Sequence, residues 1–161
     1  MPRIPVDTEN RISIPFKKRL IELIDDLELE SNSKAEFAKL VGVSTPVVTL
    51  ATIHGIIPSL RPLIKIADYF NVSLAYLLGE SDTNDFYKSE TPTTFHERLA
   101  LLTKERNTKY SVIAKTMPFT KNFFYQWQRD KTLPSLDYLK PLADYFGVTP
   151  DYLLGRTDDR N

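Results

Sequence analysis

The chain contains no cysteine and only two histidines, His54 and His96. Without cysteine, the protein has neither a disulfide framework nor a thiolate ligand for a metal ion. The two histidines are isolated from one another and from any cluster of further ligands, so we expect a surface or capping role for each. The sequence therefore predicts no metal site and no cofactor.

Long apolar runs and glycine-rich loops are also missing. No segment approaches the roughly 18 apolar residues of a membrane-spanning helix, and the N-terminal residues lack the apolar core of a signal peptide. Only five glycines are present, and no phosphate-binding loop or nucleophile with a plausible base is found. We expect a cytoplasmic protein that is not an enzyme, with no membrane partner and no evident small-molecule ligand.

The charges balance overall but are unevenly distributed. The chain has 21 basic and 21 acidic side chains. Residues 95–131 hold 8 basic and 3 acidic residues, a net charge of +5, whereas residues 16–55 hold 5 and 6, a net charge of −1. Because a positive field attracts phosphate, the second half of the chain is the better candidate for contact with nucleic acid.

The chain repeats itself. Residues 67–82 align with residues 143–158 at an offset of 76, with ten identities in sixteen positions. Further upstream, Phe16-x-x-Arg19-Leu20 matches Phe95-x-x-Arg98-Leu99 at an offset of 79, which places three extra residues of the first copy within residues 28–34. The sequence predicts one structural unit present twice, at 16–82 and 95–158, with a lengthened loop in the first copy.

Apolar periodicity and capping residues predict five short helices in each copy and an all-α fold. In the first copy the predicted helices cover 16–27, 34–40, 45–52, 60–70 and 74–78. In the second copy they cover 95–106, 110–117, 121–129, 136–146 and 150–154. Pro141 lies inside one of these helices and is expected to bend it.

Three segments lie outside the two copies. Residues 1–15 contain several prolines together with Arg3 and Arg11 and show no periodicity. They are expected to be a flexible arm, either an ordinary terminus or a segment that lies along DNA. Residues 83–94 are polar and are expected to be a linker, and residues 159–161 form a C-terminal tail.

The stretch 113–136 predicts two short helices joined by a tight turn. Thr120 is placed to cap the second helix, and Pro134 closes the stretch. At helical spacing, this second helix displays Lys121, Asn122, Tyr125, Gln126 and Arg129, while Phe124 and Trp127 lie on another side. The pattern predicts a polar, donor-rich face held in place by aromatic side chains.

Each copy carries a series of short motifs. The first copy carries Phe37-Ala38-Lys39-Leu40-Val41-Gly42-Val43-Ser44, then Pro58-Ser59-Leu60 and Leu77-Leu78-Gly79. The second carries Ile113-Ala114-Lys115, Trp127, Pro134-Ser135-Leu136 and Leu153-Leu154-Gly155. In these motifs both copies resemble the lambda-repressor-like helix-turn-helix family. The resemblance implies two tandem five-helix domains. It also implies that the third helix of a domain enters the DNA major groove while neighbouring helix starts contact phosphates.

The resemblance assigns candidate DNA contacts to the second copy. Base edges would be contacted by Lys121, Asn122, Tyr125 and Gln126. Asn and Gln can pair with adenine, and Lys can donate to guanine. The phosphate backbone would be contacted by Lys109, Tyr110, Arg129 and Lys131. Lys34, Thr45 and Thr49 are weaker candidates in the first copy. We expect a sequence-specific regulator bound to double-stranded DNA, in this family commonly a repressor of prokaryotic or phage type.

The first copy departs from the family pattern in its third helix. This helix and the residues after it are apolar and contain no amide or guanidinium group to contact bases, and they present Val47, Leu50, Ile53, Ile56 and Ile57. A surface of this kind predicts homodimerisation or another protein partner, although weak DNA binding stays open. Two further readings also stay open. The whole chain could be a protein-binding module such as an antitoxin, an antirepressor or an inhibitor, or it could be a purely structural scaffold.

Overall fold

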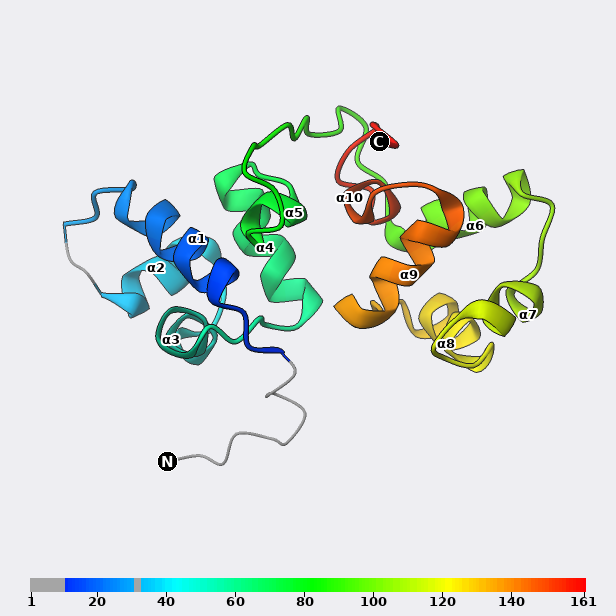
Figure 1. The fold of residues 1–161 in the computed structure, drawn as a ribbon, viewed down its shortest axis with the longest axis horizontal. Coiled ribbons are helices and arrows are strands. Elements are labelled where there is room, and N and C mark those ends of the chain that lie inside the picture. Colours follow the sequence, from blue (N-terminus) through cyan, green and yellow to red (C-terminus); the bar gives the residue numbers. More distant parts are fainter. Residues whose placement is uncertain (1–10, 31–32) are drawn as a thin grey trace. The chain divides into compact units, whose positions relative to one another are not determined.

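The computed structural model describes residues 11–30 and 33–161. This part of the chain is all-helical, and its one β interaction is an isolated bridge between Ile12 and Ile56. The chain divides into two compact units, Met1–Asp85 and Phe86–Asn161. Figure 1 colours the chain from blue at the N-terminus to red at the C-terminus, so each unit can be identified by its colours.

The first unit contains the helices α1 (Ile14–Asp25), α2 (Lys34–Val41), α3 (Thr45–His54), α4 (Leu60–Phe70) and α5 (Leu74–Leu77). Helix α2 begins as predicted, because the Ser33 hydroxyl accepts a hydrogen bond from the Glu36 amide at 3.3 Å. It ends at Gly42, whose φ of 84° is left-handed. Helices α2 and α3 are bent by 120° across the three-residue turn 42–44.

Helix α1 begins two residues earlier than predicted, because Ser13 accepts a hydrogen bond from the Phe16 amide at 3.2 Å and caps it. The residues before the helix are also tied down. The Ser13 amide donates to the Gly55 carbonyl at 2.7 Å, and the Ile57 amide donates to the Arg11 carbonyl at 2.9 Å. The prediction of a flexible arm is therefore wrong for residues 11–15. The rest of the predicted arm, with Arg3, lies outside the described residues.

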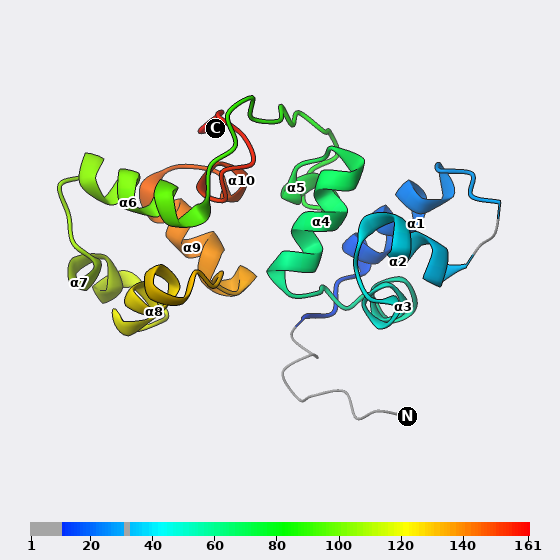
Figure 2. The same ribbon diagram turned by 180° about the vertical axis from the view of Figure 1, so that it is seen from behind.

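The second unit contains α6 (Phe95–Glu105), α7 (Tyr110–Ile113), the 3₁₀ helix η2 (Ala114–Thr116), α8 (Asn122–Asp130), α9 (Leu136–Phe146) and α10 (Pro150–Leu153), seen from both sides in Figures 1 and 2. The helix predicted over 110–117 is divided into α7 and η2. Its end is extended at Met117, with φ −99° and ψ 154°, because the residue before a proline avoids the helical conformation.

Helix α8 begins one residue later than predicted. Its N-cap is Lys121 rather than Thr120, and the Lys121 side chain makes no capping hydrogen bond. The Thr120 carbonyl accepts from the Phe123 amide at 3.1 Å instead. Pro141 lies inside α9, as predicted, and a bend at this residue stays a prediction.

An arginine of the first helix makes the same contacts in both units. Arg19 donates to the Tyr76 carbonyl at 3.2 Å and lies 3.8 Å from the centre of the Tyr76 ring. Arg98 donates to the Tyr152 carbonyl at 3.2 Å and lies 4.0 Å from the centre of the Tyr152 ring. Arg19 and Arg98 are matched in the sequence repeat, so the repeat extends to side-chain contacts that join the first helix of each unit to the last.

The predicted linker and tail are bound to the units. Asn84 donates to the Asn71 carbonyl at 3.2 Å in the first unit, and the Ser89 amide donates to the Arg156 carbonyl at 2.9 Å in the second. Arg160, in the tail, makes two hydrogen bonds of 2.9 Å to Glu105. Residues on both sides of the predicted linker therefore bond to the neighbouring unit, and the division between the units falls within 83–94, after Asp85.

No single helix among the described residues has the length and apolar character needed to cross a membrane. The bent pair α2 and α3 passes that test only when its two helices are taken together.

Candidate nucleic-acid interface

Helix α8 has one exposed polar face and one buried aromatic face. Asn122, Tyr125, Gln126 and Arg129 recur at positions i, i+3, i+4 and i+7, which lie on the same side of a helix, and all four are exposed. Lys121, just before the helix, is exposed as well. Phe124 and Trp127 are 0% and 3% exposed, so the predicted division of the helix into two faces is confirmed.

An aromatic cluster holds α8 against its neighbours. The Trp127 ring lies 5.1 Å from Phe119 and 5.8 Å from Phe95, measured between ring centres and in edge-on orientations. Phe124 also lies 5.3 Å from Phe119. Such contacts fix both the depth and the rotation of the helix, because each aromatic ring fills a large, shaped volume. The exposed face therefore rests on a well-packed core.

Gln128 joins α8 to two other helices. Its amide nitrogen donates to the His96 carbonyl on α6 at 3.0 Å and to the Tyr110 hydroxyl on α7 at 3.1 Å. The His96 ring nitrogen lies 2.8 Å from the Thr132 carbonyl, and the residue is only 8% exposed. The prediction of a surface or capping role for His96 is therefore wrong, whereas His54 is exposed in the last turn of α3.

The sequence prediction did not include Gln128 among the functional positions. A signal for its role was present, since Gln128 follows Phe124 by four residues and so lies on the buried side of the helix.

Tyr110 brings the start of α7 next to the exposed face of α8. Its ring stacks on Phe124 with centres 4.7 Å apart and an interplanar angle of 3°. It also meets the Tyr125 ring edge-on at 5.7 Å. Because the Tyr110 hydroxyl accepts from Gln128, its own proton is available to donate. Lys109, which precedes Tyr110 and is the N-cap residue of α7, is exposed. The structure thus brings together Tyr110 and Tyr125, two of the predicted DNA contacts.

Arg129 is paired with its neighbour Asp130. The guanidinium makes two hydrogen bonds to the Asp130 carboxylate, of 3.0 and 3.1 Å. The hydrogen bond from Arg129 lowers the pKa of Asp130, and the same bond raises the pKa of Arg129. Asp130 thus offsets a positive charge that the predicted phosphate contact needs. Lys131, which follows, is exposed and ends the helix in a left-handed conformation with φ 55°.

The corresponding helix of the first unit, α3, offers fewer polar groups. Thr45 is exposed, but the Thr49 hydroxyl donates to the Thr45 carbonyl at 3.1 Å within the helix, so its proton is already used. Lys34 is exposed at the first residue of α2, in a different helix. The three weaker candidates therefore do not present a continuous donor-rich face.

The predicted partner surface on and after α3 is smaller than expected. Ile53 is 48% exposed, and Val47, Leu50 and Ile57 are half-buried. Ile56 is only 4% exposed and pairs with Ile12 in the β-bridge. The prediction that Ile56 belongs to an exposed surface is therefore wrong, because the chain before α1 covers it.

Within residues 11–30 and 33–161, no group of three or more His, Cys, Asp and Glu side chains is arranged to hold a metal ion. Comparison of the chain with protein families, curated proteins and solved structures finds no match.

Proposed function

We propose that the protein is a sequence-specific regulator that binds double-stranded DNA through two tandem lambda-repressor-like helix-turn-helix units. In this proposal, α8 of the second unit docks in the major groove. The observation that carries the proposal is the α8 face, on which amide, ammonium and phenol groups are exposed above a buried aromatic cluster. Amide side chains at such positions can pair with adenine, and an ammonium group can donate to guanine.

The surroundings of α8 supply the charge that such docking needs. Residues 95–131 carry a net charge of +5, from 8 basic and 3 acidic residues. Lys109 and Lys131 are exposed before α7 and after α8, where they would contact phosphates on either side of the groove. Contacts of this kind give affinity that decreases as the salt concentration rises.

The first unit supports the same architecture with a different role. The bend of 120° between α2 and α3, across a three-residue turn, lies in the range typical of helix-turn-helix pairs. Its α3 has no amide or guanidinium side chain and exposes Ile53, which favours a protein contact. In a homodimer, two copies of α8 would have to lie about one helical turn of DNA apart, roughly 34 Å, to enter neighbouring stretches of the major groove. Repression by occlusion of a promoter would be the outcome typical of this class.

A second candidate function is a protein-binding module, such as an antitoxin or an inhibitor, that uses α3 on its partner. The exposed Ile53 side chain and the half-buried Val47 and Leu50 beside it favour this alternative. It predicts that α8 is dispensable for function.

The two candidates are separated by selection of genomic DNA fragments with the purified protein, followed by binding measurements at several salt concentrations. We expect enrichment of one sequence. Gln126→Ala should relax the preference at one base position and cost about 1–3 kcal/mol of binding free energy. Lys88→Ala is the matched control, because Lys88 is exposed in the second unit but lies outside α7 and α8.

Two results would contradict the proposal. One is a selection without enrichment, combined with a Kd for random DNA above roughly 100 μM at physiological salt. The other is an equal loss of affinity for all sequences in Gln126→Ala, which would exclude base contact by this side chain.

A further inference from the structure

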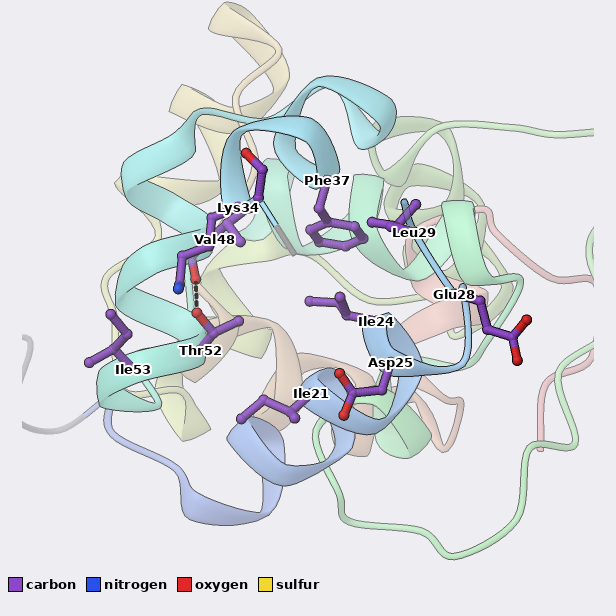
Figure 3. Close-up of a pocket in the computed structure, with 11 residues that line it drawn as sticks. Ile21, Ile24, Asp25, Glu28, Leu29, Lys34, Phe37, Val48, Thr52 and Ile53 are labelled. Atoms are coloured by element: carbon purple, nitrogen blue, oxygen red, sulfur yellow. Dashed lines mark hydrogen bonds between the residues drawn. The ribbon is translucent and has the colours of Figure 1, made fainter. Parts of the chain in front are cut away.

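The first unit contains a cavity of about 340 Å³ between α1, α2 and α3, shown in Figure 3. Side chains from all three helices line it, and Ile24, Leu29 and Phe37 converge on it. Phe37 and Val48 are each 1% exposed, so the inner wall is both buried and apolar. Sites for organic ligands in proteins have volumes of roughly 300–1,000 Å³ and mostly apolar walls. The cavity matches the lower end of that range.

The repeat explains why the cavity exists. At the offset of 76, the lining residues Lys34, Val48 and Thr52 correspond to Tyr110, Phe124 and Gln128 of the second unit. There the three larger side chains contact one another: Tyr110 stacks on Phe124 with ring centres 4.7 Å apart, and Gln128 donates to the Tyr110 hydroxyl at 3.1 Å. In the first unit, the positions of Tyr110 and Phe124 are taken by Lys34 and Val48, neither of which has an aromatic ring. The space it leaves open corresponds to the place of a phenol ring in its twin.

The edge of the cavity on the α1 side is acidic. Asp25 and Glu28 lie on this edge and are exposed, whereas Lys34 is the single basic residue of the lining. The segment 22–30 contains five acidic residues and no basic residue. Inside the cavity, the Thr52 hydroxyl donates to the Val48 carbonyl at 2.8 Å, so its proton is not available to an anion. The field at this site therefore favours a positively charged ligand over a negatively charged one.

We propose that the first unit binds a small organic cation, with an aromatic ring in the cavity and an ammonium group at the edge formed by Asp25 and Glu28. The ring would contact Phe37 and Val48 and so touch both α2 and α3. The site is independent of DNA binding by α8, because every residue that lines it belongs to the first unit. Nothing in the sequence predicted a ligand here, since the cavity arises from side chains that are small relative to their counterparts.

The proposal can be tested with two probes of similar length and opposite charge, 4-phenylbutylamine and 4-phenylbutyrate, added to the full-length protein labelled at its isoleucine methyl groups. The amine should shift the NMR signals of Ile21, Ile24 and Ile53, which line the cavity. The signal of Ile113, buried in the second unit, should not move. We expect the carboxylate to bind at least about tenfold more weakly.

Three variants connect the binding to the cavity. Lys34→Tyr places a ring where the second unit has Tyr110, and should weaken amine binding by about tenfold or more. Lys34→Ala removes the same positive charge without filling the space, so it should preserve or strengthen binding. Asp25→Asn should reduce the preference for the amine, whereas Asp26→Asn, an exposed change on the same helix end but outside the lining, should preserve it.

The proposal is overturned if neither probe shifts the isoleucine signals up to about 5 mM, a concentration at which even a weak ligand would bind. It is also overturned if the two probes bind equally, or if Lys34→Tyr and Lys34→Ala have the same effect. A failure of these tests would leave the DNA-binding proposal standing, since the observation that carries that proposal is the exposed face of α8.

Discussion

At the residue scale, two glycines of the second unit share a left-handed backbone but have different surroundings. Gly147 has a φ of 67°, and the nearest atom to an added Cβ would be the flexible Arg106 guanidinium at 3.6 Å. Gly155 has a φ of 78°, but an added Cβ would collide with the backbone carbonyl group of Thr93. A side chain at Gly147 meets only the conformational cost, whereas one at Gly155 must also displace the chain before α6.

We therefore predict different losses of stability for the two alanine variants. Gly147→Ala should cost about 1–2 kcal/mol, the cost of a left-handed conformation for an L-residue, and Gly155→Ala should cost more than about 3 kcal/mol. The loss is measured from hydrogen exchange of the slowest amides of α6 and α9. Equal losses in the two variants would show that the carbonyl of Thr93 moves aside easily.

Arg98 illustrates what single residues reveal in a sequence and what they do not. Its match with Arg19 helped to identify the repeat. The sequence did not predict that Arg98 is only 7% exposed, or that it donates to the carbonyls of Tyr152 and Thr157. Such partners are more than fifty positions away in the chain, and only the packing of α6 against α10 brings them within reach.

At the element scale, Asp130 offsets part of the positive charge that α8 presents. Asp130 makes two hydrogen bonds to Arg129 and thereby occupies its guanidinium. Asp130→Asn should release Arg129 for contact with a DNA phosphate and remove one negative charge beside the proposed DNA interface. We predict severalfold tighter binding to all DNA sequences and a salt slope that is steeper by about one phosphate contact. Binding isotherms at several salt concentrations measure both quantities.

The pH dependence of the proposed DNA binding provides a control for this prediction. Since the hydrogen bond from Arg129 lowers the pKa of Asp130, the carboxylate stays ionised at neutral pH. It is protonated only when the pH falls below the usual pKa of an aspartate side chain. In the natural chain, affinity should rise as the pH falls through that lowered pKa, and Asp130→Asn should lose this part of the rise. If the two proteins respond to acid identically, Asp130 does not limit Arg129.

The helices were predictable to different degrees, for physical reasons. The bounds of α4 and α9 agree with the predictions because proline and serine precede each helix, and Asn71 or Gly147 ends it. The second helix of the second unit was wrong at its end, because Pro118 forces Met117 into an extended conformation. The exposed face of α8 followed from helical spacing. The pairing of Arg129 with Asp130 did not, because spacing does not determine side-chain partners.

At the scale of the whole molecule, the residues on either side of the division make hydrogen bonds within their own unit. Asn84 bonds within the first unit and Ser89 within the second, and the division falls between Asp85 and Phe86. Each unit has its own buried core; the fully buried side chains include Phe16, Leu20 and Leu63 in the first unit and Phe95, Leu99 and Leu139 in the second. Each unit therefore has what an independently folding domain requires.

We predict that fragments 1–85 and 86–161 fold when they are expressed separately. Their amide NMR spectra should superpose on the matching signals of the full chain, except near the cut. Fragment 86–161 should show the proposed salt-dependent DNA binding, because α7 and α8 lie within it, but with lower affinity than the full chain if the first unit supplies the dimer contact. An unfolded second fragment would show that the two units depend on each other.

The burial of Trp127 has an optical consequence. This side chain is the only tryptophan of the protein. It belongs to α8, is 3% exposed and lies edge-on to the Phe119 ring. Tryptophan fluorescence therefore reports on the second unit alone, while the first unit contributes only tyrosine emission. A shift of the emission maximum on denaturation would indicate that the aromatic cluster is lost. A change of emission intensity on mixing with DNA would indicate a change at α8, the helix proposed to enter the major groove.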